Sequence, residues 1–145
     1  LDDSFKDYQK QVLVNSKRLA EILMKNGFNC ITGGTDTHLV LLDLRGSGFT
    51  GKDAEKALSD AGITTNKNAI PFDPQPPAIA SGVRIGTPGV TTRGMKEQEI
   101  DLIGELIIEA IKNGENQEAL ISCKKRVNDL CSKFPIYKDL LIWFV

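Results

Sequence analysis

A proline-rich segment near the middle of the 145-residue chain restricts what the whole chain can fold into. Between residues 64 and 81 the apolar side chains follow neither the helical nor the strand period. Four prolines occur there: Pro71, Pro74, Pro76 and Pro77. Because proline fixes φ and lacks a backbone N–H, neither a helix nor a strand ladder is expected to continue through this segment. Loops of this length are uncommon inside compact domains and tend to be functional or disordered, and we predict a functional loop.

Two helices are predicted before this loop. Apolar residues recur at helical spacing over residues 5–26, and Gly27 is expected to end this long amphipathic helix. Thr50 is followed three residues later by Asp53, which is the spacing of a capping box with aspartate in place of the usual Glu or Gln. The helix that starts there has its apolar residues on one face and is expected to end at Gly62.

Three short strands are predicted from β-branched and apolar segments. Residues 28–32 and 38–44 lie on either side of Gly-Gly-Thr-Asp and predict a hairpin. The second segment is apolar at successive positions, which predicts a strand covered on both faces. Residues 82–86 read Gly-Val-Arg-Ile-Gly, so valine and isoleucine share one face while Arg84 alone occupies the other. We expect Arg84 to point away from the helices, with the proline-rich loop bordering that side.

Two further amphipathic helices are predicted at residues 95–112 and 116–133, separated at Gly114 and ended by Pro135. The predicted order α-β-β-α-loop-β-α-α favours the α+β class, with a small, mainly antiparallel sheet and helices packed on one face. The other face of such a sheet needs a partner. At this length the chain is expected to form a single domain, residues 1–145.

Composition argues against several classes of function. The net charge is −1, and the one dense basic cluster, residues 124–126, has no interleaved aromatics, so a nucleic-acid partner is not expected. One histidine and three cysteines without Cys-x-x-Cys spacing argue against a metal site and for reduced thiols in the cytoplasm. The longest apolar run, residues 140–145, is far shorter than the ~20 residues of a membrane helix, so no membrane partner is expected. The chain begins with Leu1 rather than Met, so organellar targeting stays open.

Three motifs in a fixed order resemble one known family. They are Gly-Gly-Thr-Asp-Thr-His-Leu at residues 33–39, Thr-Asn-Lys-Asn-Ala-Ile-Pro at residues 65–71 and Ser-Gly-Val-Arg-Ile-Gly-Thr-Pro at residues 81–88. Over about residues 4–137 the chain resembles serine hydroxymethyltransferase, and within it the C-terminal small domain of this fold-type I pyridoxal-phosphate enzyme. Residues 138–145 form an apolar tail outside the family pattern, of a kind that can cover a groove on a larger protein or subunit.

The resemblance implies an enzyme that interconverts serine plus tetrahydrofolate with glycine plus 5,10-methylenetetrahydrofolate. It also implies that pyridoxal phosphate is held mainly by a larger domain of the same polypeptide, whose lysine lies upstream of these motifs. This domain is therefore expected to contain no catalytic or cofactor-binding residue and to be inactive alone. The complete enzyme is expected to form a homodimer or a higher oligomer.

Two residues take binding roles from the resemblance. Arg84 matches the arginine of the family's Gly-x-Arg-x-Gly-Thr-Pro motif, which implies a bidentate contact with the substrate carboxylate. Asn68 matches the second asparagine of Asn-Lys-Asn, which resembles a folate contact. Without the motifs, Arg84 would be read as a surface strand residue and Asn68 as a turn residue. His38 and Arg93 are interpreted as structural, and Lys67 as a solvated loop charge.

Two other functions fit the same residues. One is a free-standing module that binds an amino acid or a folate, and the other is a dimerisation domain without catalysis. A reading frame that continues upstream through the segment with the lysine that binds pyridoxal phosphate would favour the enzyme over both.

Overall fold

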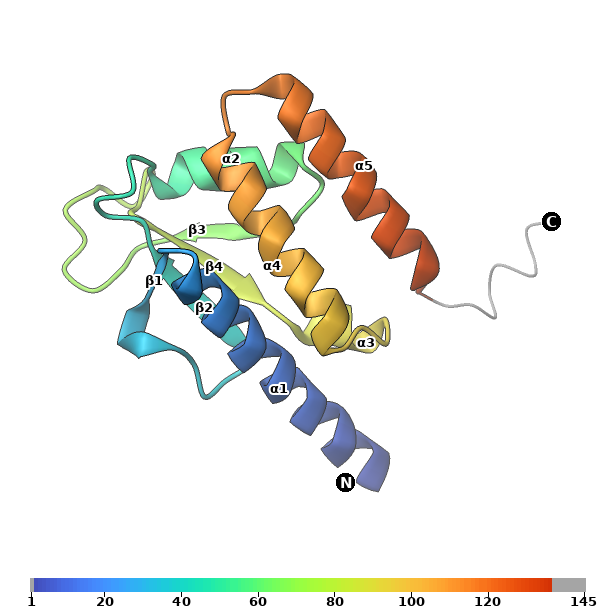
Figure 1. Ribbon diagram of the computed structural model, residues 1–145. Helices are drawn as coiled ribbons and strands as arrows, with labels where there is room; N and C mark the ends of the chain where they lie inside the picture. Colours follow the sequence, from blue (N-terminus) through green and yellow to red (C-terminus); the bar gives the residue numbers. More distant parts are fainter. Residues whose placement is uncertain (1, 137–145) are drawn as a thin grey trace.

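Four antiparallel strands form the centre of the computed structural model, which describes residues 2–136 (Figure 1). The strands are β1 (Asn29–Cys30), β2 (Leu39–Asp43), β3 (Asn66–Asn68) and β4 (Gly82–Gly86). Their order across the sheet is β1-β2-β4-β3, and each neighbouring pair is antiparallel. The predicted antiparallel sheet and the hairpin of β1 and β2 are therefore confirmed.

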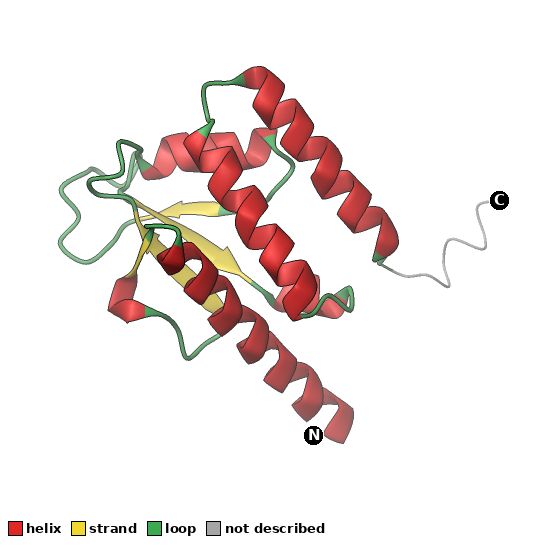
Figure 2. Ribbon diagram, viewed as in Figure 1, coloured by secondary structure: helices red, strands yellow, loops and turns green. Residues whose placement is uncertain are grey.

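The helices gather on one side of this sheet (Figure 2). They are α1 (Asp3–Lys25), α2 (Gly51–Asp60), α3 (Pro88–Thr92), α4 (Glu97–Lys112) and α5 (Gln117–Lys133), with a 3-10 turn η1 (Ile31–Gly33) after β1. α1 and α4 lie side by side, α2 contacts β3 and β4, and α5 packs against α4 and α2 (Figure 1). This arrangement confirms the α+β class with helices on one sheet face. No helix among residues 2–136 is long and apolar enough to cross a bilayer.

Local sequence signals define the ends of the predicted helices. Gly27 follows α1 with φ +88°, a left-handed conformation that costs glycine little. The capping box before α2 is present with both of its bonds. Asp53 N donates to Thr50 Oγ1 at 3.2 Å, and Thr50 N donates to Asp53 Oδ2 at 3.0 Å.

The core lies between the helices and the sheet. Val40 and Leu42 of β2 and Val83 and Ile85 of β4 are buried against the helices. Leu41 pairs with Arg84 and therefore lies on the opposite sheet face, where Leu39 and Leu41 are half-buried. The prediction that this strand is covered on both faces is thus wrong for residues 2–136, because all of the packed helices lie on one side. We call the other side, which carries Leu41 and Arg84, the open face.

The structure adds two elements that the sequence pattern did not predict. Asn66–Asn68, within the segment predicted as a loop, forms edge strand β3. This strand has no apolar alternation, so only pairing with β4 stabilises it. Pro88–Thr92 forms α3, a short helix with proline in its first turn, where the missing N–H costs no hydrogen bond. The apolar tail, residues 138–145, lies outside the described residues.

Candidate substrate-binding face

Arg84 occupies the centre of β4 and points away from the helices. Its neighbours Val83 and Ile85 are buried at 0% and 6% exposure, whereas Arg84 is exposed. The prediction that Arg84 lies on the uncovered sheet face is therefore confirmed. Its guanidinium makes no hydrogen bond or ion pair with any of residues 2–136. Five N–H donors in a planar fork are thus directed to whatever approaches this face.

β3 brings two asparagines beside this arginine. Asn66 is the pairing partner of Arg84, and Asn68 is the partner of Gly82. Because directly paired residues share a sheet face, both asparagines lie on the open face with Arg84. Asn68 and Arg84 are diagonal neighbours, a relation that places residues about 7–8 Å apart. The two residues assigned from the motifs are therefore close together, and the structure adds Asn66, which lies directly opposite Arg84.

Lys67 lies on the other face of β3 and is not a solvated loop charge. Its Nζ is 3.0 Å from Glu55 Oε2 on α2, and its backbone N–H donates to Glu55 Oε1 at 2.9 Å. These bonds from Lys67, first the backbone and then the side chain, hold the pKa of Glu55 below its usual range. They attach the polar edge strand to the helix layer, which turns Asn66 and Asn68 outward.

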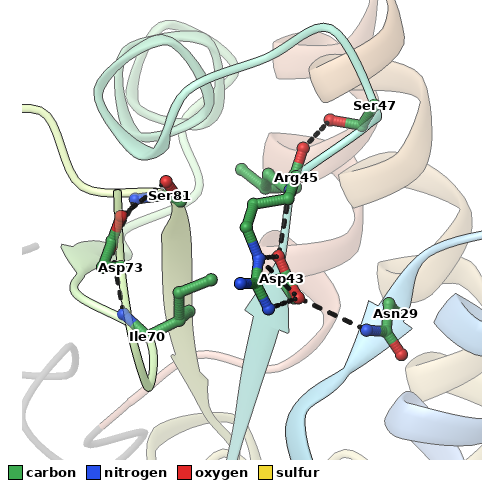
Figure 3. Close-up of polar contacts among 8 residues, drawn as sticks. Asn29, Asp43, Arg45, Ser47, Ile70, Asp73 and Ser81 are labelled. Atoms are coloured by element: carbon green, nitrogen blue, oxygen red, sulfur yellow. Dashed lines mark hydrogen bonds and ion pairs between the residues drawn. The ribbon is translucent and has the colours of Figure 1, made fainter. Parts of the chain in front are cut away.

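Asp43 is the acidic strand residue on the open face, and an ion pair with Arg45 compensates its negative charge. Arg45 Nη2 donates to Asp43 Oδ2 at 2.7 Å and Arg45 Nε donates to Oδ1 at 3.0 Å, while Asn29 contacts the same carboxylate (Figure 3). The Arg45 hydrogen bond lowers the pKa of Asp43, although burial of the carboxyl acts in the opposite direction. Asp43 is diagonal to Arg84 in the sheet, yet its charge is compensated by Arg45.

Asp73 orders the proline-rich loop next to β4. Its carboxylate accepts hydrogen bonds from Ser81 Oγ at 2.7 Å and from the backbone N–H groups of Ser81 and Ile70 at 2.8 and 3.1 Å (Figure 3). The backbone N–H of Gln75 donates to the same carboxylate at 2.9 Å. Burial acts to raise the pKa of Asp73, but the hydrogen bonds from Ser81, Gln75 and Ile70 dominate and hold it well below its ordinary value. These hydrogen bonds therefore tie Ile70, Gln75 and Ser81 to one carboxylate and hold the loop next to the start of β4.

Gly82 allows the loop and both neighbouring strands to approach closely. A Cβ at this position would lie 2.6 Å from Ile70 Cγ2, 2.7 Å from the Leu42 carbonyl oxygen and 2.8 Å from the Asn68 carbonyl oxygen. Ile70 itself is buried at 4% exposure. Glycine at the start of the Gly-Val-Arg-Ile-Gly strand is thus a packing requirement that brings Asn68 and the loop next to Arg84.

Two other residues interpreted as structural have clear positions. The carbonyl of His38 accepts a hydrogen bond from Thr87 N at 3.0 Å, but its imidazole is exposed and unbonded within residues 2–136. The structural role of His38 is therefore the hydrogen bond of its backbone carbonyl, and its side chain takes no part in it. Arg93 donates from Nε to the Phe134 carbonyl at 2.8 Å and from Nη2 to the Cys131 carbonyl at 3.1 Å. Its structural role is confirmed, and its side chain caps the C-terminal end of α5.

The open face combines the guanidinium of Arg84 with mainly neutral side chains on its strands. The strand residues that share this face with Arg84 include amides, leucines and glycines, and within residues 2–136 these strands place no lysine there. A covalent attachment to pyridoxal phosphate needs such a lysine. The described strand residues of the open face therefore include a guanidinium that can pair with a carboxylate, but no amine.

Sequence reasoning missed three contributors to this face. Asn66 is signalled by the period-2 spacing in Asn-Lys-Asn, which places both asparagines on one side of a strand once β3 is recognised. Asp73 stands among prolines, where an aspartate commonly bonds the backbone two residues later, as it does with Gln75 N. The Asp43–Arg45 pair has no distinct signal in the sequence.

The fold and this site define an α+β domain that covers one face of its sheet with helices. The other face presents two asparagines and an arginine that is unpaired among residues 2–136. Residues 1–107 match the family model for serine hydroxymethyltransferase. The chain belongs to this family, and its function is serine hydroxymethyltransferase-like. The match includes all three motifs and ends within α4, whereas the resemblance by motif and spacing extends to about residue 137. Members of the family are pyridoxal-phosphate-dependent transferases of serine and glycine in one-carbon metabolism, with a folate cosubstrate.

Proposed function

We propose that this chain supplies the substrate-carboxylate contact and part of the folate site of a glycine hydroxymethyltransferase. The reaction would interconvert serine plus tetrahydrofolate with glycine plus 5,10-methylenetetrahydrofolate. The observation that carries the proposal is Arg84, exposed at the centre of β4 and unpaired among residues 2–136. An arginine with no partner in the described part of the chain, on a face that the helices leave open, can bind a carboxylate ligand with two parallel hydrogen bonds.

Arg84 would bind and orient the amino acid rather than transfer protons. Its guanidinium stays charged at any working pH and can donate two parallel hydrogen bonds to one carboxylate. The nearest carboxylate of the sheet does not compete, because Asp43 is held by Arg45. Pyridoxal phosphate, when bound to the complete enzyme, supplies the electron sink for the reaction. Because no residue described here supplies that sink, we expect the isolated chain to bind without catalysing.

Asn68 would contribute the folate contact. Its Nδ2 donates to the Ala69 carbonyl at 2.7 Å, which orients the side chain and leaves Oδ1 to accept a hydrogen bond from a ligand. Its diagonal relation to Arg84 supports one continuous site in which the amino acid and the one-carbon carrier lie side by side.

The open face would also be the contact with the larger, cofactor-binding domain of the polypeptide. Leu39 and Leu41 are half-buried there, and Phe72, at the tip of the proline-rich loop, is 99% exposed. Apolar side chains of this kind are stabilised when a second surface covers them. We further propose a homodimer or higher oligomer, and a cytoplasmic location that the three free cysteines support.

The test is to replace Arg84 in the complete enzyme by alanine and by lysine. Loss of a charge-assisted, bidentate contact should weaken serine binding by at least about tenfold, because one such hydrogen bond contributes roughly 1.5–3 kcal/mol. Lysine should restore little, since it keeps the charge but lacks the planar fork. Arg126→Ala is the matched control, because Arg126 pairs with Glu109 on the helical side. The cofactor absorbance should be unchanged in all three variants. Wild-type serine affinity in both Arg84 variants would contradict the proposal.

A further inference from the structure

An apolar groove opens where α3, α4 and α5 meet, away from the open sheet face. It has a volume of about 390 Å³ and is lined mainly by aliphatic side chains. Val90, Ile103 and Val127 line it and remain only partly buried in residues 2–136. A cavity of this size matches the lower range of pockets that hold drug-sized molecules, about 300–1,000 Å³, so it has room for several side chains. Apolar surface of this kind is stabilised when it is covered.

The chain leaves the described structure at the rim of this groove. Ile136, the last described residue, lines it, and so does Cys131 in the last turn of α5. Arg93, which also lines the groove, holds this turn through the carbonyls of Cys131 and Phe134. The point from which residues 137–145 continue is therefore fixed beside the groove.

We propose that residues 137–145 fold back and pack the apolar run 140–145 into this groove of the same chain. The run reads Leu-Leu-Ile-Trp-Phe-Val and contains no charged side chain. This matches the lining formed by residues 2–136, whose one cation, Arg93, is already hydrogen-bonded. Nine residues span up to about 30 Å when extended, so the run reaches the groove from Ile136. A tethered segment also has an effective concentration of the order of mM for its own groove, which favours it over a second copy in dilute solution.

Two residues already present in the chain report on this packing, so no reporter residue has to be introduced. Trp143 is the single tryptophan of the chain. Cys131 is the partly exposed thiol, whereas Cys30 and Cys123 are buried. Burial raises the pKa of Cys30 to about 11 and also raises that of Cys123, so both stay protonated and slow to react near neutral pH. Reaction with a thiol reagent in the native state is therefore expected to follow Cys131.

The experiment compares the 145-residue chain with a version that ends at Ile136. In the longer chain we expect Trp143 emission shifted to shorter wavelength than in urea and protected from acrylamide. The Cys131 thiol should react more slowly than in the shortened chain. Val127→Asp, in the groove wall, should shift Trp143 emission to longer wavelength and speed Cys131 labelling in the longer chain only. Ile121→Asp is the matched control on the same helix, because Ile121 is 67% exposed and outside the groove.

Far-UV circular dichroism establishes that each variant is folded, and Ile103→Thr replaces Val127→Asp if the latter unfolds. Native Trp143 that is quenched as strongly as in urea would overturn the proposal. So would a Trp143 shift that disappears on dilution, because it would show that the segment enters the groove of a second copy. Equal Cys131 reactivity in the two chain lengths would also count against it.

Discussion

Asn66 and Arg84 lie directly opposite each other on β3 and β4, on the sheet face that the helices leave uncovered. Side chains in this relation have Cβ atoms about 4.5–5.5 Å apart, so a charge placed at residue 66 acts directly on the guanidinium of Arg84. In the native sequence the asparagine is neutral and leaves the arginine available to a ligand.

Asn66→Asp should therefore weaken serine binding to the complete enzyme while it stabilises the domain. The new carboxylate would pair with Arg84 across the strands and compete with the substrate carboxylate, and we expect about a tenfold loss of serine affinity. The same pair should add about 0.2–1 kcal/mol to the free energy of unfolding. Titration calorimetry and urea denaturation measure the two effects. Asn66→Ala is the control and should change serine affinity much less. Unchanged affinity in Asn66→Asp would show that Arg84 does not contact the carboxylate.

Asp73→Asn should loosen the proline-rich loop and remove a pH-dependent part of the stability. Asp73 has a folded-state pKa below its unfolded value of about 3.9, so its contribution is complete above about pH 4 and is lost as the pH falls through the folded pKa. The variant should have a lower melting temperature than the native chain at pH 7, and the difference should shrink below about pH 4. Asp36→Asn, an exposed change, should show no such pattern. A pH-independent difference would contradict this account of Asp73.

Gly82→Ala should destabilise the sheet where β2, β3 and β4 meet. The added Cβ would meet the carbonyl oxygens of Leu42 and Asn68 at 2.7 and 2.8 Å, and these backbone atoms cannot move without shifting both strands. Overpacking of this kind costs typically about 1–3 kcal/mol. Urea denaturation measures it. Gly89→Ala is the matched control, because a Cβ there meets nothing within 4 Å. Equal stability of the two variants would contradict the close packing at Gly82.

Asn15→Leu should weaken the attachment of α1 to the segment that follows β4. The Asn15 side chain is fully buried, and its Nδ2 donates to Thr91 Oγ1 at 2.9 Å and to the Met95 carbonyl at 3.0 Å. Leucine would leave that carbonyl buried without a donor, at a cost of about 1–3 kcal/mol. Asn26→Leu, at the exposed end of the same helix, should cost less. Urea titration of each variant measures its free energy of unfolding. An equal loss in Asn15→Leu and Asn26→Leu would contradict this account of Asn15.

The sequence by itself determined most of the helices and the orientation of Arg84. The 3.6-residue periodicity located α1, α2, α4 and α5 to within about two residues at their ends, because each helix buries one apolar stripe against the sheet. The alternation in Gly-Val-Arg-Ile-Gly was sufficient to place Arg84 on the uncovered face, since Val83 and Ile85 had to face the core.

Only the tertiary structure decided what surrounds Arg84. β3 carries no apolar pattern, and it exists because β4 offers an edge and Glu55 binds Lys67 from the other side. Folding also decides the contacts of Asp73, whose four donors come from three residues that the loop brings together. It likewise decides the contacts of Arg93, which caps a helix some 38 residues away. Local patterns record which side of an element is buried, whereas cross-strand partners and polar contacts depend on residues that are distant in the chain and meet only after folding.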